Sequence, residues 1–272
     1  MMKKSILAVL VAVIMVWGCN GNNADDVHNS NAHEVELPKE VSDLNKAVAA
    51  NPNNNSLRLQ LAIALDSIGL PALAITQMDK LVTTDSIDDK IWLSRASIAE
   101  DAKDTMKAME SYARALRINE SPGGLLNLAN LYAETKNPRA LLICSRVKDM
   151  ALGKEYDANS AFIAGIYYAR TGNRSAALQK FDESIANNYT FMEAYIEKGM
   201  VYFDNRQYEE ALTIFKFAAT VNSLYADAYY YQARCYEMLN KKDSAILRFK
   251  QSLGLDKNLP EAHNGLKRLG AE

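Results

Sequence analysis

An alanine recurs at nearly constant spacing through most of this 272-residue chain. Successive alanines are 34, 32, 37, 34 and 34 residues apart, and they are Ala74, Ala108, Ala140, Ala177, Ala211 and Ala245. Twelve residues ahead of each, or eleven in the third case, stands a second small residue: Ala62, Ala96, Ala129, Gly165, Gly199 and Ala233. Self-similarity at this period indicates an array of short structural repeats.

The repeat length fits two α-helices joined by short turns. At about 1.5 Å of rise per residue, a unit of this length holds two helices of three to four turns. In residues 158–191, apolar side chains recur with helical spacing on both sides of a turn at residues 171–173. Because neither helix can bury its apolar face alone, we predict an all-α protein in which successive helix pairs stack.

The residues at these fixed places resemble the tetratricopeptide repeat (TPR) family. In the unit that starts at Met192, the family's series of aromatic and small residues is Tyr195, Gly199, Tyr202, Ala211, Phe215 and Ala218. The unit from residue 55 departs from the series because Arg58 stands where an aromatic is usual, and the third unit has Cys144 in an aromatic place. The resemblance implies a right-handed α-solenoid of about six TPR helix pairs, with a half repeat before them and a capping helix after them.

We predict the following division of the chain. A signal peptide (1–18) and a disordered, lipid-anchored tether (19–37) precede the helices. A half-repeat helix (38–54) leads into six repeats and a final capping helix. The repeats span 55–88, 89–121, 122–157, 158–191, 192–225 and 226–259, the third being irregular, and the capping helix spans 260–272.

The first residues are typical of an exported protein. Lys3 and Lys4 precede an apolar run at residues 6–17, which is too short to span a hydrocarbon layer of about 30 Å and is typical of a secretory signal peptide. Residues 16–19 resemble the bacterial lipobox, which implies that Cys19 is lipidated and becomes the N-terminus, although Trp17 departs from the usual small residue. The alternative is an ordinary secreted protein.

The lipobox resemblance implies a place in the cell envelope. Residues 20–36 are rich in asparagine and acidic residues and have little apolar surface to bury, so we predict a flexible tether between Cys19 and the repeats. We expect an outer-membrane lipoprotein. Asp25 and Asp26 resemble surface-export signals of certain Gram-negative lipoproteins, and the periplasmic side of the membrane is the open alternative.

The charged residues give no sign of catalysis or of nucleic-acid binding. The 31 basic and 33 acidic residues give a formal net charge of −2, and no basic stripe is present to follow a phosphate backbone. The three histidines, His28, His33 and His263, lie outside the six repeats, so none can complete a catalytic group there. We predict that the chain is not an enzyme and holds neither a cofactor nor a metal.

The TPR resemblance implies that the first helix of each pair lines an inner, concave wall. One place beyond the leading aromatic position, all six side chains are apolar: Leu59, Leu93, Leu126, Phe162, Ile196 and Tyr230. One turn further, the middle and late repeats carry Ile166, Met200 and Arg234. We predict a groove for an amphipathic helix or an extended apolar peptide of a partner protein. The alternative is that these side chains pack against neighbouring first helices.

These observations favour a non-catalytic scaffold that binds other proteins at the bacterial envelope and serves the assembly of an outer-membrane complex. The alternative is a binder of a cell-wall or carbohydrate ligand through exposed aromatics.

Cys144 and Cys235 are predicted to be buried and unpaired, because several helices separate them.

Four Asp-Ser/Thr-apolar triplets resemble the O-glycosylation signal of some Gram-negative exported proteins, and helix capping is the alternative explanation. Their hydroxyl residues are Ser67, Ser86, Thr105 and Ser244.

Overall fold

The computed structural model describes residues 37–84 and 87–271. Over these residues the chain forms fourteen α-helices and no strand, which confirms the α-solenoid. The signal peptide, residues 19–36 of the predicted tether with Cys19, and Ser86 lie outside the described residues. No helix within the described ranges is long and apolar enough to cross a membrane.

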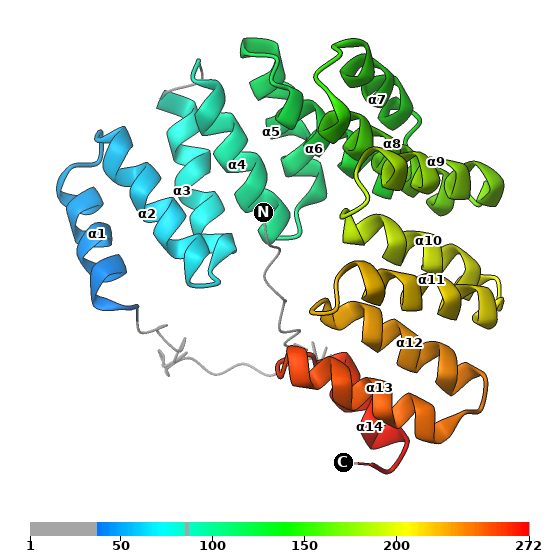
Figure 1. Cartoon of the computed structure of the whole chain (residues 1–272). Coiled ribbons are helices and arrows are strands. Elements are labelled where there is room, and N and C mark those ends of the chain that lie inside the picture. The colour runs from blue at the N-terminus through cyan, green and yellow to red at the C-terminus, as the bar shows by residue number, and fades with distance from the viewer. Residues whose placement is uncertain (1–36, 85–86, 272) are drawn as a thin grey trace, which may run out of the picture.

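The helices follow one another in pairs along an arc (Figure 1). A single helix, α1 (Lys39–Ala50), precedes the first pair, and α14 (Pro260–Arg268) follows the last. The first helices of the pairs are α2 (Asn55–Ser67), α4 (Asp89–Asp101), α6 (Pro122–Glu134), α8 (Lys154–Arg170), α10 (Met192–Asp204) and α12 (Ala226–Met238). The second helices are α3 (Pro71–Thr84), α5 (Thr105–Ile118), α7 (Arg139–Asp149), α9 (Arg174–Asn187), α11 (Tyr208–Val221) and α13 (Lys242–Leu255).

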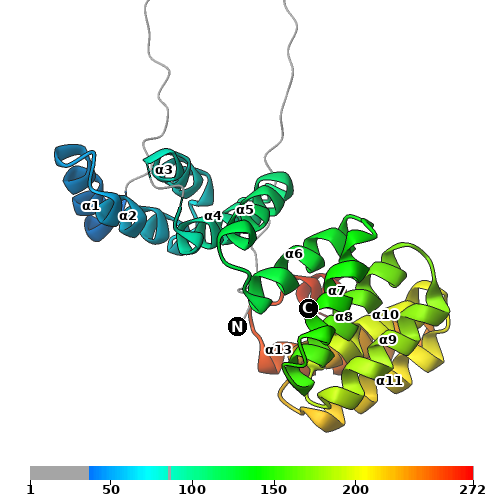
Figure 2. The same ribbon diagram turned by 90° about the horizontal axis from the view of Figure 1, so that it is seen from above.

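The first helices form the inner side of the arc. They contact one another across repeats, α2 with α4, α6 with α8, α8 with α10 and α10 with α12, and no two second helices in the described part of the chain make comparable contacts. Helices on the inside of a curved stack lie closer together than those outside it. Seen from above, α1–α5 lie in one row and α7–α11 pack at the other end of the molecule (Figure 2).

The recurring small residues lie where the two helices of a pair touch. All six alanines that set the period are fully buried. In α8 and α10 the small residue of the first helix is a glycine, and the ring of a phenylalanine from the second helix lies directly over it, Phe181 over Gly165 and Phe215 over Gly199. The sequence pattern therefore marks the closest approach within each pair.

One residue with a left-handed backbone reverses the chain inside every pair. Its φ lies between 58° and 82° in all six turns, and the residues are Gly69, Lys103, Lys136, Gly172, Arg206 and Asn240. Only glycine and asparagine adopt this conformation readily. Two lysines and an arginine adopt it here, because the helices on either side fix the geometry of the turn.

A side chain on the first helix of several pairs holds the preceding loop. The hydroxyls of Tyr195 and Tyr229 donate to main-chain carbonyls six residues earlier, at 3.0 Å and 3.1 Å. Arg58 makes the same contact with the Pro52 carbonyl at 2.6 Å, and on the single terminal helix α14 Nε2 of His263 does so with the Lys257 carbonyl at 3.1 Å. We call this contact the loop tether.

The third pair differs from the others in the length of its second helix. Helix α7 has only 11 residues, and Ala151 (φ 51°) and Gly153 (φ 100°) turn the chain soon after its end. Helix α8 therefore begins at Lys154, four residues before the predicted start of the fourth repeat, and runs for 17 residues. Its greater length brings it against α6 as well as against α7 and α9.

Candidate functional site: the inner wall

The first three predicted groove residues are partly buried side chains on α2, α4 and α6. Leu59, Leu93 and Leu126 each pack against the hydrophobic core of their own part of the array while keeping some surface exposed. Ile63, one turn beyond Leu59, is 53 % exposed. The N-terminal half therefore offers scattered apolar surface.

On α8 and α10 the predicted residues divide between core and surface. Ile166 is 1 % exposed and Ile196 is 9 % exposed, so both lie in the core. Phe162 and Met200 stay partly exposed. The ring of Phe162 lies 4.9 Å from that of Phe191 and 5.9 Å from that of Phe181, measured between centroids.

On α12 the two predicted groove residues, Tyr230 and Arg234, are hydrogen-bonded to each other and lie against aromatic rings. Tyr230 is 9 % exposed, and its ring centroid lies 5.9 Å from that of Phe249. Its hydroxyl accepts from Nη1 of Arg234 at 3.1 Å. The guanidinium of Arg234, itself partly exposed, lies 5.6 Å from the ring centroid of Phe203 on α10.

Three of the predicted groove residues therefore follow the alternative prediction and pack between neighbouring helices. They are Ile166, Ile196 and Tyr230. Six predicted residues keep exposed surface, and a partner could contact them directly. These six are Leu59, Leu93, Leu126, Phe162, Met200 and Arg234.

An arginine joins three first helices. Arg170 of α8 forms ion pairs with Glu134 of α6 at 2.9 Å and with Glu197 of α10 at 3.2 Å. Burial acts to lower the pKa of Arg170, but the two carboxylates outweigh burial and raise it. The guanidinium is therefore always charged, and its two ion pairs hold α6, α8 and α10 in fixed positions relative to one another.

A row of carboxylates on the inner side was not singled out from the sequence. Glu193, Asp227 and Glu261 are the second residues of α10, α12 and α14, and we call them the acidic rim. Burial raises the pKa of Asp227, a hydrogen bond from the Tyr225 hydroxyl lowers it, and Asp256, Glu261 and Glu193 raise it further. The period of 34 residues was the signal that could have revealed this row.

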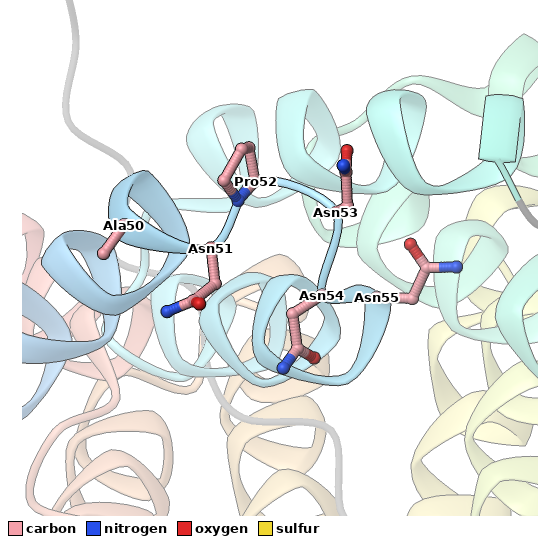
Figure 3. A pocket seen from close by; sticks show the side chains of 6 residues that line it. All are labelled: Ala50, Asn51, Pro52, Asn53, Asn54 and Asn55. Carbon is pink, nitrogen blue, oxygen red and sulfur yellow. The ribbon is translucent and has the colours of Figure 1, made fainter.

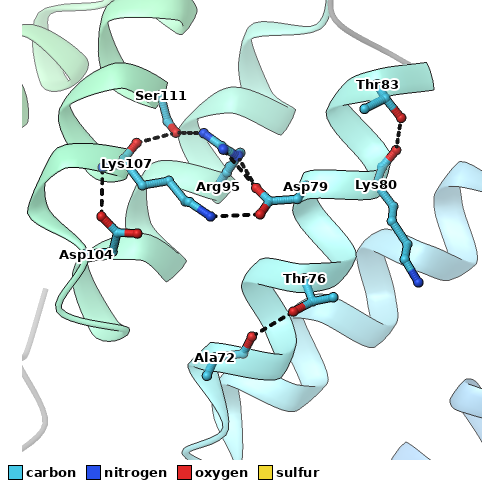
Figure 4. Close-up of polar contacts among 9 residues, drawn as sticks. All are labelled: Ala72, Thr76, Asp79, Lys80, Thr83, Arg95, Asp104, Lys107 and Ser111. Atoms are coloured by element: carbon cyan, nitrogen blue, oxygen red, sulfur yellow. Dashed lines mark hydrogen bonds and ion pairs between the residues drawn. The ribbon is translucent and has the colours of Figure 1, made fainter.

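Another polar cluster joins α3, α4 and α5, and its role is structural (Figure 4). Asp79 accepts from Nε of Arg95 at 2.9 Å and from Nζ of Lys107 at 2.7 Å, and Arg95 also donates to the Ser111 hydroxyl at 2.6 Å. Two cations thus neutralise the Asp79 carboxylate, and the Ser111 hydroxyl donates to the Lys107 carbonyl at 2.6 Å. The cluster therefore links the first two pairs.

A hollow at the turn between α1 and α2 is lined by residues 50–55 (Figure 3). Two of its asparagines hold the ends of the adjoining helices: Asn51 donates to the Ala47 carbonyl at 3.2 Å, and Asn54 accepts from the Leu57 amide at 3.1 Å. Across the described residues, no group of three His, Cys, Asp or Glu side chains could hold a metal ion.

The hydroxyls of the glycosylation triplets occupy different surroundings. Ser67 is exposed and donates to the Ala64 carbonyl at 2.8 Å. Thr105 is the first residue of α5, and Asp104 before it caps that helix by accepting from the Lys107 amide at 3.0 Å. Ser244 is half-buried and precedes the fully buried Ala245. Helix capping thus accounts for the triplet at Thr105.

The chain is similar in sequence to models of the tetratricopeptide repeat over residues 89–122 and over residues 162–216 and 196–260. No curated protein matches it. A solved TPR protein from Parabacteroides merdae is 19 % identical, with a TM-score of 0.69 over 85 % of this chain and 91 % of that chain.

Two further solved structures resemble it. PilW, a widely conserved type IV pilus biogenesis factor, is 20 % identical, with a TM-score of 0.60 over 79 % of this chain and 99 % of that one. PilF of Pseudomonas aeruginosa is 17 % identical, with a TM-score of 0.52 over 85 % of this chain and all of that one. At these identities the likenesses show the fold alone.

Proposed function

We propose that this chain, which carries tetratricopeptide repeats over residues 89–122 and 162–260, is a non-catalytic scaffold that is tethered to the bacterial cell envelope and binds a segment of a partner protein. The TPR fold supports a scaffold for protein–protein interaction. The binding surface is the inner wall of α8, α10 and α12. The process served is the assembly of a complex at the outer membrane.

The observation that carries the proposal is a run of apolar surface on successive first helices. Phe162 on α8, Met200 and Phe203 on α10, and Tyr231 on α12 are all partly exposed. Arg170 and the ring contacts hold the backbone beneath them, so a partner does not have to order this surface before binding. Partly exposed apolar side chains on a fixed, curved wall suit an extended or helical segment.

The predicted signal peptide and lipid-anchored segment at residues 1–37 support a location at the cell envelope. The apolar run at residues 6–17 and the lipobox resemblance at Cys19 favour export followed by lipidation, and several acyl chains would anchor the protein firmly. PilW offers an analogy of fold, since it is a pilus biogenesis factor with a similar helical array. The analogy names no partner for this chain.

Site-specific photo-crosslinking in intact cells tests the proposal. A photoreactive phenylalanine analogue at Met200, on the inner wall, is expected to give a discrete adduct with one protein, identified by mass spectrometry. The control is the same analogue at Leu247 on α13, an outer side chain that is 62 % exposed. The same adducts from both positions would refute the inner wall as the binding surface.

The anchor is tested in the same cells. We expect Cys19→Ser to move the protein from the membrane fraction to the soluble fraction while leaving its helix content unchanged. A variant that stays in the membrane fraction would refute the lipid anchor but not the scaffold.

A further inference from the structure

Two networks of ion pairs divide the array into two arms. The carboxylate of Asp79 joins α3, α4 and α5 through ion pairs with Arg95 at 2.8 Å and with Lys107 at 2.7 Å. Arg170 joins α6, α8 and α10 through its two ion pairs. Neither network crosses from α5 to α6. We call helices α1 to α5 the first arm and helices α6 to α14 the second arm.

The inner wall is least closely packed where the two arms join. Among the first helices of the six pairs, every other pair of neighbours is in closer contact than α4 and α6. In Figure 2 the first arm forms one row, and α6 lies between that row and helices α7 to α11. The link between the arms therefore depends mainly on the contact of α5 with α6.

The contact of α5 with α6 is apolar, with a neutral hydrogen bond at its edge. Leu128 and Leu131 of α6 lie in one core cluster with Tyr112 of α5. Nδ2 of the exposed Asn127 donates to the Tyr112 hydroxyl at 3.2 Å. Apolar contacts are not directional, so they persist when two helices shift against each other, whereas the ion pairs within the arms require a fixed geometry.

The backbone at the start of α6 also favours movement. The helix begins with Pro122, Gly123 and Gly124, and Ser121 caps it by accepting from the Gly124 amide at 3.3 Å. Gly123 is exposed, and an added Cβ there would have no atom within 4 Å. Because glycine has the widest range of backbone conformations, a first turn with two glycines bends more readily than the starts of the other helices.

We infer that the contact between α5 and α6 is a hinge at which the two arms move as rigid bodies, so that the inner wall of the free chain opens and closes. The motion belongs to the chain itself. Its use rests on the proposed function: a partner segment that contacts Ile63 in the first arm and Met200 in the second holds the hinge in one position. Such a segment is long enough to reach both arms.

Distances between spin labels test the hinge. Double electron–electron resonance is measured on the full chain with Cys19→Ser, in which the buried Cys144 and Cys235 stay unlabelled. Each label pair replaces two exposed side chains on helices four places apart in the chain. The pairs are Lys46 with Arg114 in the first arm, Leu142 with Thr213 in the second arm, and Thr76 with Leu142 across the hinge.

We expect the distance distribution across the hinge to be about twice as broad as either distribution within an arm, since the motion of rigid arms is concentrated at their joint. Gly124→Ala places a Cβ against the first arm, 3.2 Å from Cδ2 of Leu116 and 3.4 Å from Cδ2 of Leu93, and 2.8 Å from the rotatable Ser121 hydroxyl. It should shift the mean distance across the hinge by roughly 1–2 Å, and unchanged distances within the arms would show that the variant is folded. The matched control, Gly123→Ala, should shift none of the three.

Equal widths for the three pairs, or a distance across the hinge that Gly124→Ala leaves unchanged, would overturn the hinge. Its use is tested in intact cells with the photoreactive phenylalanine analogue at Ile63, which is 53 % exposed in the first arm. We expect the adduct that forms from Met200 to form from Ile63 as well. An adduct from Met200 alone would overturn the bridging of the two arms. The absence of adducts from both positions would refute the proposed function, whereas the label distances decide the hinge independently.

Discussion

Gly199 offers the sharpest test of why the repeat needs a small residue on its first helix. A Cβ at this position would lie 2.5 Å from Cζ and 2.8 Å from Cδ1 of Phe215, and closer still to Cε1. Phe215 is fully buried, and its ring is stacked on that of Tyr231 with centroids 5.1 Å apart. Since the ring has no free space to enter, Gly199→Ala forces α10 and α11 apart.

The expected cost follows from two opposing effects. Overpacking in a core costs about 1–3 kcal/mol, and we take the upper half of that range because Tyr231 blocks the ring. Alanine gains up to about 1 kcal/mol over glycine in a helix interior. The net destabilisation is about 1–2 kcal/mol, which corresponds to a Tm lower by roughly 2–8 °C for a domain of this size.

Thermal unfolding followed by far-UV circular dichroism measures the effect. The matched control is Gly254→Ala in α13, where an added Cβ has no neighbouring atom within 4 Å. This control should leave the Tm unchanged or raise it slightly. Adding Phe215→Leu to Gly199→Ala should recover part of the loss. If Gly199→Ala is as stable as Gly254→Ala, the close approach of the two helices does not set the repeat pattern.

Two further predictions concern titratable groups. Burial acts to raise the pKa of Asp79, but hydrogen bonds from Lys107 and Arg95 outweigh it and hold that pKa below its ordinary value. A depressed carboxyl pKa stabilises the fold above the unfolded value of about 4, and the stabilisation is lost as the pH falls through the folded value. The Tm difference between the native chain and Asp79→Asn should therefore be largest near neutral pH and shrink in acid, and a constant difference would contradict the ion pairs. Burial raises the pKa of Cys144 and Cys235 to about 12. Iodoacetamide should therefore modify these two thiols only after unfolding in urea, as peptide mapping would show, and rapid modification of the native chain would disprove their burial.

The alanine period was sufficient to predict the fold because it records a packing contact. Every one of those alanines is fully buried between two helices, so the spacing in the sequence is the spacing of the structure. The predicted burial of Cys144 and Cys235 is also confirmed, and both thiols are unpaired. The turns were less visible: Lys103 and Arg206 adopt left-handed φ values of 61° and 60° without a glycine to signal them.

The inner wall was harder to predict, since a period assigns a helix face but not the distance to the next helix. Ile166 and Ile196 were assigned to the groove, and the close contacts of α8 with α6 and α10 bury them. Arg58 shows the opposite case. It seemed a departure from the aromatic pattern, yet it donates to the Pro52 carbonyl as Tyr195 donates to the Tyr189 carbonyl. A long side chain with a polar hydrogen at its end satisfies that position.

The loop tether has a consequence for which loop residues the array can exchange. Its acceptors are main-chain carbonyls, at Pro52, Tyr189, Ser223 and Lys257, so the bond is indifferent to which side chain the acceptor residue carries. The conformation of the loop therefore does not depend on which side chain stands at the acceptor position. Substitutions at the acceptor positions are therefore expected to keep this bond and the thermal stability that it supports.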